Sequence, residues 1–323
     1  MAGIAAITGA TGFLGRNIVA ALAAAGWRVR ILARHDPVHP LFLGIDLDVV
    51  PGDVSDKGAL RHLTADADVV VHAAGVVKAM DDAGFHRVNV GGTQNLLDAM
   101  QQAGASARVM LISSLAAREP AISAYARSKR AAEDTVKENA GGRPWVIVRP
   151  CAIYGPEDRE TLALFAAVSK GIVPRFAPEN ARVAMLFVQD AAHAVANLCA
   201  AQTNNQVYEL SDVQHQGYTW RMLRDHAEQA LATKSILVPV PRPLVHGIAS
   251  ANGAIARLRG RAVMFGPGKA REVRHADWSS PSDRQPPPDI WTAKTDLPTG
   301  FRATVAWYRE HGWLPPCASA PHG

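Results

Sequence analysis

Short apolar runs alternate with longer amphipathic segments through the first half of the chain. Six runs rich in Val and Ile have the length and composition of buried strands: residues 3–8, 28–32, 47–50, 68–74, 107–113 and 145–149. Four segments between them repeat apolar residues at a spacing near 3.6, and several end at glycine: residues 14–26, 57–65, 85–104 and 125–142. This alternation predicts an α/β fold with a doubly wound parallel sheet.

The regular alternation ends near residue 155, where proline and glycine become frequent. We therefore predict a dinucleotide-binding domain over residues 1–155, with residues 182–201 returning to it as one strand and one helix. Residues 156–181 and 202–323 are expected to form a smaller substrate-binding lobe. Apolar and aromatic residues are frequent in the lobe, and we interpret them as its core in preference to a substrate-binding surface: Phe165, Phe176, Met185, Tyr218, Trp220 and Phe265.

Composition narrows the class of protein. The chain of 323 residues is 48% hydrophobic and 20% charged, as in globular proteins with a sizeable core. Its net charge is +5, but the basic residues are dispersed, so nucleic acid is not expected as a partner. No apolar run reaches the ~18 to 20 residues of a membrane span, and no signal peptide is expected. Cys151, Cys199 and Cys317 match neither a disulfide framework nor a zinc site, and no histidine has metal-ligand spacing, which favours a cytoplasmic protein without a metal.

A glycine-rich turn follows the first predicted strand. Gly9, Gly12 and Gly15 stand in "TGATGFLGR" at the start of a helix, where glycines allow close approach of a pyrophosphate and the helix N-terminus offers free N–H groups. In such Rossmann-type sites an acid at the end of the second strand binds the ribose of NAD, whereas a base accommodates the 2′-phosphate of NADP. Arg34 stands there, so we predict NADP over NAD, although Arg34 at a solvated strand end and nearby Asp36 leave NAD open.

Tyr125 and Lys129 are four residues apart on a predicted helix and therefore share one face. A cation near a phenol favours the phenolate, so Lys129 would make Tyr125 a usable acid and base. A serine at the end of the preceding strand, Ser114 with Ser113 as the alternative, could orient a substrate oxygen. The competing interpretation is structural: Tyr125 would cover a helix face and the serines would end a strand.

Together these motifs resemble the extended short-chain dehydrogenase/reductase family. The resemblance rests on "TGATGFLG" at 8–15, "GDV" at 52–54, "HAAG" at 72–75, "NVGGTQNLLDA" at 89–99 and "YARSK" at 125–129. It implies a cofactor site that includes the turn, the ends of several strands and the Tyr-Lys pair: Gly9, Thr11, Gly12, Phe13, Leu14, Gly15, Arg34, Asp53, Val54, Ala73, Ala74, Gly75, Tyr125, Lys129, Pro150 and Ile153. It also implies that Asn89 supports a helix irregularity and a proton relay, beside the alternative of a core hydrogen bonder, and that two chains pair through the helices bearing 89–104 and 123–140.

Departures from the motifs of individual subgroups of this family narrow the range of reactions that we expect. The acid pair of the sugar dehydratases is missing after Ser114, and Ala152 stands where epimerases that act on UDP-sugars carry asparagine. We interpret Cys151, beside the expected nicotinamide site, as a packing residue. The favoured function is an NADP(H)-dependent oxidoreductase that interconverts a secondary alcohol and a ketone on a small organic substrate. A nucleotide-sugar epimerase with tightly bound NAD and a noncatalytic NAD(P)-binding subunit or sensor stay open.

One stretch of the lobe is apolar with basic residues at its end, over residues 241–261. Such a stretch could touch a membrane or a partner helix. A cap over the active site is the simpler interpretation, and no membrane partner is expected.

Overall fold

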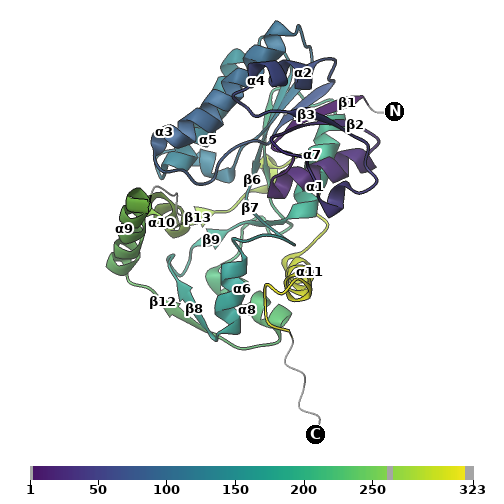
Figure 1. Ribbon diagram of the computed structural model, residues 1–323. Coiled ribbons are helices and arrows are strands. Elements are labelled where there is room, and N and C mark those ends of the chain that lie inside the picture. The colour runs from purple at the N-terminus through teal and green to yellow at the C-terminus, as the bar shows by residue number, and fades with distance from the viewer. Residues whose placement is uncertain (1–2, 260–264, 317–323) are drawn as a thin grey trace.

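The computed structural model describes residues 3–259 and 265–316, and Cys317 lies outside them. A seven-stranded parallel sheet in the order β11-β6-β5-β4-β1-β2-β3 forms the upper part of the molecule (Figure 1). Its strands are β1 (Ile4–Thr8), β2 (Arg28–Ala33), β3 (Leu47–Pro51), β4 (Val69–His72), β5 (Arg108–Ile112), β6 (Trp145–Pro150) and β11 (Gln206–Leu210). The predicted α/β fold with a doubly wound parallel sheet is confirmed.

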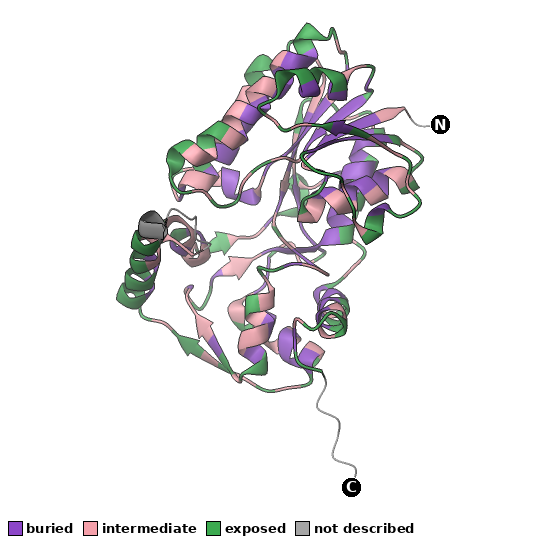
Figure 2. Ribbon diagram, viewed as in Figure 1, coloured by how far each residue is buried: buried purple, intermediate pink, exposed green. Residues whose placement is uncertain are grey.

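Successive residues of each strand enter opposite core layers, because side chains alternate across a sheet. Ala5 and Ile7 pack toward α1 (Phe13–Ala24) and α7 (Val188–Ala200), whereas Ala6 packs on the other face. That second face is covered by α2 (Lys57–Thr64), α4 (Gly92–Gln102) and α5 (Ala124–Asn139). Because both faces are covered, the strands are buried (Figure 2), as their continuous apolar runs predict.

The last strand of the sheet comes from a part of the chain that the sequence analysis assigned differently. Residues 182–201 were expected to supply a strand and a helix, and 202–323 to belong to the lobe. The helix α7 does pack on the sheet, but the strand is β11, at residues 206–210. β9 (Arg182–Val183) and β10 (Met185–Phe187) pair elsewhere. Because α7 crosses over the sheet before β11 begins, β11 can lie parallel to β6. The spacing of apolar residues in the sequence did not reveal this connection.

The lobe below the sheet has its own core. Its helices are α6 (Leu162–Ser169), α8 (Trp220–Leu231), α9 (Arg242–Arg259), α10 (Pro267–Arg274) and α11 (Leu297–Glu310), and its two-stranded parallel sheets pair β7 (Ala152–Tyr154) with β10, β8 (Ile172–Arg175) with β12 (Ile236–Pro239), and β9 with β13 (Asp277–Trp278). Phe165, Met185 and Tyr218 are buried in this core, which confirms their interpretation as packing residues. Phe176 and Phe265 instead pack with α9 and α10 in a small separate cluster.

Short helical segments complete the chain. They are η1 (Pro40–Phe42), α3 (Asp82–Phe85), η2 (His86–Gly91), η3 (Leu115–Arg118) and η4 (Ser282–Arg284). η2 is a π-helical segment that joins α3 to α4. No helix among the described residues is long and apolar enough to cross a membrane.

Candidate active site

The glycine turn lies between β1 and α1. Gly9 has φ +74°, and a Cβ there would lie 2.5 Å from the backbone nitrogen of Ala74, which belongs to the segment after β4. A Cβ on Gly15 would lie 2.0 Å from the carbonyl oxygen of Gly9. These two glycines are therefore required by the protein's own backbone.

Gly12 differs from its two neighbours in the motif. The one protein atom close to a Cβ there is the Gly9 oxygen, at 3.3 Å, so the space over Gly12 is open. Gly12 is also the N-cap of α1, no side chain caps that helix, and its first turn carries no acid. Free N–H groups beside open space fit the pyrophosphate of a dinucleotide.

The end of β2 opens into a pocket of about 200 Å³ next to the turn. Arg34, His35, His39 and Arg16 line it with Thr11. Arg16 and His39 are both tied to Glu157 by ion pairs. Arg34 has no carboxylate within 4.0 Å among the described residues, so its charge is available to a ligand.

The adjacent loop carries the two residues expected beside the adenine. Asp53 accepts hydrogen bonds from the amide and hydroxyl of Ser55, which, with a smaller effect of the Arg34 charge, lower the pKa of its carboxyl. Val54 packs against Gly92 of α4. Asp53 is therefore an ionised acid held by its own loop after β3, the strand that pairs with β2.

Tyr125 and Lys129 lie in the first turns of α5, which begins where the Ser123 side chain caps the amide of Ala126. Lys129 is buried, and its Nζ donates to the carbonyl oxygen of Ile112, 2.7 Å away at the end of β5. The Tyr125 ring packs at 6.0 Å from that of Phe85. The helix thus presents the phenol and the ammonium group to the carboxyl end of the sheet.

The two serines after β5 have different partners. Ser113 is buried and donates to Glu133 over 2.5 Å, so it is committed to the protein interior. Ser114 caps η3 through the amide of Ala116, and its hydroxyl lies close enough to Tyr125 to lower the pKa of the phenol. Of the two, Ser114 is the serine that meets the tyrosine.

Burial shifts both titratable groups of the pair away from their ionised forms. It raises the pKa of Tyr125 to about 12, against the opposite effect of the Ser114 hydrogen bond and with further contributions from the charges of Glu272 and Glu160. It lowers the pKa of Lys129 to about 8, while the charge of Glu133 acts in the opposite direction. At neutral pH the phenol therefore carries its proton.

Asn89 lies in the π-helical segment η2, where the helix irregularity was expected. Its side chain donates to the Ser128 hydroxyl over 2.9 Å and accepts from the amide of Val76 over 2.8 Å. A Cβ placed on Gly75 would lie 3.1 Å from Asn89 Oδ1 and 3.6 Å from Lys129 Nζ. Asn89 thus joins the segment after β4 to α5 beside the Lys129 ammonium group.

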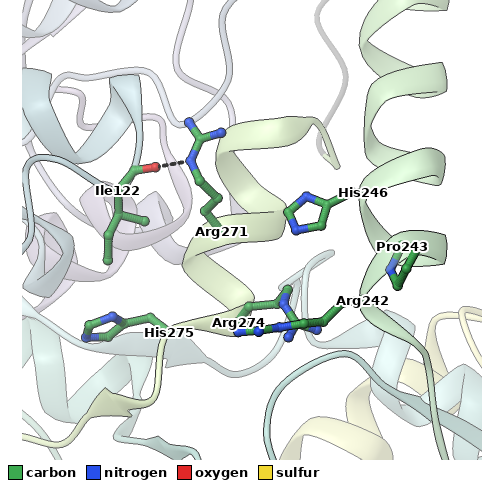
Figure 3. Close-up of a pocket in the computed structure, with 7 residues that line it drawn as sticks. All are labelled: Ile122, Arg242, Pro243, His246, Arg271, Arg274 and His275. Carbon is green, nitrogen blue, oxygen red and sulfur yellow. Dashed lines mark hydrogen bonds between the residues drawn. The ribbon is translucent and has the colours of Figure 1, made fainter.

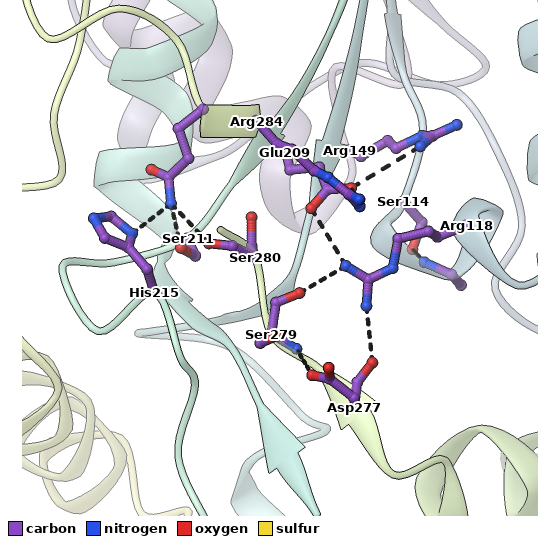
Figure 4. Close-up of polar contacts among 12 residues, drawn as sticks. Ser114, Arg118, Arg149, Glu209, Ser211, His215, Asp277, Ser279, Ser280 and Arg284 are labelled. Carbon is purple, nitrogen blue, oxygen red and sulfur yellow. Dashed lines mark hydrogen bonds and ion pairs between the residues drawn. The ribbon is translucent and has the colours of Figure 1, made fainter. Parts of the chain in front are cut away.

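Buried charges behind the site are paired. Arg149 on β6 donates two hydrogen bonds, of 2.8 and 2.6 Å, to the carboxylate of Glu133, which has no exposed side-chain surface. The Glu209 carboxylate on β11 lies near Arg149, Arg118 and Arg284 (Figure 4). This ion-pair network fixes α5 against the strands that carry it.

Arg118 ties the Ser114 turn to the lobe. It ends η3, the helix that Ser114 caps, and donates to the carbonyl oxygens of Ser279 and Asp277 over 2.7 and 2.8 Å (Figure 4). The position of the Ser114 hydroxyl is therefore set from both the sheet and the lobe.

Two further residues expected near the cofactor follow β5 in the chain, on β6 and β7. Pro150 is buried at the end of β6, whereas Ile153 lies on β7, pairs with Leu186 and packs on the core beside α7. Cys151 packs on the same core, and burial raises the pKa of its thiol well above the ordinary value. A packing residue is the role that its position fits. Within the described part of the chain no cluster of His, Cys, Asp and Glu could hold a metal ion.

Two functional neighbours escaped the sequence analysis. Glu272 of α10 accepts a hydrogen bond from Ser123 and acts electrostatically on Tyr125, as does Glu160. Lys269 bridges the two acids at 3.6 and 3.7 Å. Glu272 is 147 positions from Tyr125 in the sequence, and no motif connects the two, so only the folded lobe could reveal that this charge lies near the phenol.

Comparison with known proteins agrees with this geometry. The model of the NAD dependent epimerase/dehydratase family matches residues 5–211. The chain is 44% identical over 313 residues to a ceramide reductase of Caulobacter vibrioides, covering 97% of this chain and 96% of that protein. A 3 beta-hydroxysteroid dehydrogenase/Delta 5→4-isomerase of Mycobacterium tuberculosis is 29% identical over 243 residues, 64% of each chain.

Among solved structures, MoeE5 in complex with UDP-glucuronic acid and NAD has the same fold. Its TM-score is 0.73 at 19% identity, covering 96% of this chain and all of that one. The matched model and these relatives confirm the resemblance drawn from the sequence motifs. The chain belongs to the NAD-dependent epimerase/dehydratase family of extended short-chain dehydrogenases/reductases and is an NAD(P)-binding oxidoreductase.

Proposed function

We propose that this enzyme uses NADPH to reduce a ketone to a secondary alcohol, with Tyr125 as proton donor, Ser114 as substrate-orienting residue and Lys129 as cofactor clamp. The observation that carries the proposal is the Tyr125 phenol, half-buried, close to the Ser114 hydroxyl and one helical turn from the Lys129 ammonium. Its pKa of about 12 keeps it protonated at neutral pH, as ketone reduction requires of a general acid.

The protein's own groups support three tasks in this reaction. Ser114 donates toward the substrate oxygen and polarises the carbonyl, and Tyr125 gives its proton to that oxygen as negative charge develops there. Lys129, released from the Ile112 carbonyl, would hold ribose hydroxyls of the dinucleotide, while its charge would stabilise the phenolate that is left behind. The bound nicotinamide supplies the hydride. Asn89, bonded to Ser128, would keep the backbone after β4 in place beside Lys129.

The cofactor preference rests on the pocket at the end of β2. Arg34 is free of a carboxylate partner among the described residues, and His35 and His39 line the same pocket. A 2′-phosphate there would meet a guanidinium group, whereas Ala33 stands at the end of β2, where an acid would bind the 2′-hydroxyl of NAD; the one acid among the described residues that line the pocket is Asp36. This favours NADPH.

For the substrate we propose a ceramide-type lipid that carries a ketone. The support is the ceramide reductase of Caulobacter vibrioides, which matches this chain over 96% of its own length. A ceramide has a secondary hydroxyl beside the carbon that bears its amide, so the corresponding ketone is the compound on which this chemistry would act.

The test is NADPH oxidation by the full chain with a 3-oxoceramide, followed by identification of the alcohol. Tyr125→Phe should lower turnover by roughly 10²-fold or more and retain NADPH binding, because it removes a proton donor and little volume. Phe85→Leu, which alters the ring packed on Tyr125, serves as the structural control. Normal turnover by Tyr125→Phe would refute the mechanism, and a nucleotide sugar turned over in place of the ketone would refute the substrate class.

A further inference from the structure

The helix α9 stands at the edge of the lobe, with α10 between it and the rest of the molecule (Figure 1). It packs on α10 through a narrow stripe in which Val245 and Ala249 are buried. α10 makes the contact with the start of α5, where Glu272 accepts a hydrogen bond from Ser123. A cap over the active site, the role favoured for residues 241–261, stays a prediction for α9. Most of the visible surface of α9 is exposed (Figure 2).

The outward sector of α9 is apolar. At about 100° per residue, Pro243, Leu244, Gly247, Ile248, Ala251, Ala254 and Ile255 project within one sector of the helix, which carries no charged side chain among the described residues. Leu244 is 54% exposed, Ile248 41% and Ile255 43%. A continuous row of exposed aliphatic side chains on one helix face indicates a surface that another phase or molecule covers.

A basic pocket adjoins this sector at Pro243, on the side of α9 that faces α10. It has a volume of about 510 Å³ and lies between α9, α10 and the segment before α5, lined by Arg242, His246, Arg271, Arg274 and His275 with Ile122 and Pro243 (Figure 3). Arg242 and Arg274 both line it, near enough for the charge of one to act on the other. Burial, and then the charge of Arg242, lower the pKa of Arg274.

The positive charge of the pocket is uncompensated. Within the described ranges no carboxylate lies within 4.0 Å of Arg242, Arg271 or Arg274. Arg271 and Arg274 each donate to one backbone carbonyl, of Ile122 and Phe176, which holds the groups in place and leaves their charge unneutralised. Three neighbouring guanidinium groups without an acid are suited to a phosphate.

We propose that α9 docks the enzyme on an anionic lipid surface, with the apolar sector in the interface and a lipid phosphate in the basic pocket. An interfacial helix of this kind combines an exposed apolar face with flanking cations. The described helices are too short or too polar to span a bilayer, so the contact is peripheral. A second copy fits less well, because an isologous contact through α9 would bring two basic pockets toward each other.

The docking does not depend on the reaction that the enzyme catalyses, although a surface-bound enzyme would suit a lipid substrate. Flotation of the full chain with vesicles of phosphatidylcholine alone or mixed equally with phosphatidylglycerol measures it directly. We expect binding to the mixed vesicles, weakened by salt and absent from the neutral ones.

Two variants and a matched control probe the two halves of the surface. Arg242→Glu should weaken vesicle binding by roughly tenfold or more, because it reverses one charge at the membrane surface. Ile248→Glu should weaken it similarly by placing a carboxylate in the apolar sector. Arg221→Glu makes the same charge change at an exposed position of α8 and should bind as wild type.

Each other outcome contradicts docking. Equal binding to neutral and anionic vesicles, no binding to either, or equal behaviour of Arg242→Glu and Arg221→Glu would refute it. Titration with inorganic phosphate that binds without any vesicle association would assign the pocket to a soluble anion, and a dimer dissolved by Ile248→Glu would assign the stripe to self-association. Turnover of a short-chain ketone in solution should be the same in all three variants, which separates a failure of docking from a failure of the proposed reaction.

Discussion

Charged and apolar groups are paired or covered around α5, whereas those described on the outer face of α9 lack partners. Behind α5, Glu133 and Arg149 are buried and paired, and Ser113 satisfies a further lone pair of the carboxylate. On α9, exposed Ile248 lacks cover and Arg242 lacks an acid within the described residues. Interior polar groups whose hydrogen bonds and charges are satisfied within the protein hold a site rigid. Charged and apolar groups that lack a partner at the surface indicate that a partner outside the protein covers them.

The largest effect is expected when a paired carboxylate behind α5 is removed. Glu133→Ala should lower the free energy of unfolding by about 3–5 kcal/mol, because it removes the carboxylate that accepts two hydrogen bonds from the mostly buried Arg149 and leaves only the Glu209 carboxylate, 4.0 Å away. Asp134→Ala is the matched control: it removes the exposed i,i+3 partner of Lys137 and should cost less than about 0.5 kcal/mol. Urea unfolding measures both. Equal destabilisation would mean that burial does not distinguish the two carboxylates.

Gly15 and Gly12 show a similar contrast within one turn: Gly15 contacts the protein's own backbone, whereas Gly12 borders open space. Gly15→Ala forces a Cβ to within 2.0 Å of a backbone oxygen and should lower stability by about 1–3 kcal/mol or more. Gly12→Ala meets one oxygen at 3.3 Å, so it should nearly retain the wild-type melting temperature while weakening dinucleotide binding at least tenfold. Thermal unfolding with and without cofactor separates them. Unchanged NADPH affinity of Gly12→Ala would contradict a pyrophosphate over that glycine.

Substitution of Arg34 tests whether the predicted cofactor site, like α9, leaves an unpaired cation for a ligand to bind. Arg34→Ala should weaken NADPH binding by roughly 10- to 100-fold, as expected for a lost charge-assisted hydrogen bond, and leave NADH binding unchanged. Arg28→Ala, at the exposed opposite end of β2, is the control. Fluorescence titration with both cofactors gives the ratio. An equal loss for NADH and NADPH would contradict a 2′-phosphate site.

Lys129 is intermediate between the two regions, because it is buried yet has no carboxylate within 4.0 Å among the described residues. Its pKa of about 8 lies below the ordinary 10.5, so kcat/KM for ketone reduction should fall up to tenfold per pH unit above about pH 8, where the free enzyme loses this charge. The unfolded chain binds the proton more strongly, so this group makes folding stability rise with pH between about 8 and 10.5.

A pH profile of kcat/KM, with urea unfolding across the same range, measures both effects. Lys129→Met should remove the Lys129 contribution to the pH dependence of unfolding. A kcat/KM that stays flat to pH 10 would show that the Lys129 charge is not required.

The spacing of residues within the motifs was enough to predict much of the candidate site. Tyr125 and Lys129 share a helix face by period alone, and the glycines of the turn follow a strand that the Val and Ile content identifies. Local pattern alone does not separate Ser113 from Ser114, because both follow β5, and the structure adds that Ser113 donates to Glu133. The catalytic role of Ser114 stays a prediction. The strand β11 was misassigned because its run of five residues lies where proline and glycine had already interrupted the pattern.

The sequence by itself determined the parallel sheet, the glycine turn and the pairing of Tyr125 with Lys129, since these follow from local periodicity and short spacing. Only the tertiary structure decided that Glu272 acts on Tyr125, that β11 completes the sheet and that the apolar side of α9 faces outward. Those features depend on contacts between residues far apart in the chain and on which face of an amphipathic helix finds a partner. Local patterns predict that a face is apolar, whereas packing determines what covers it.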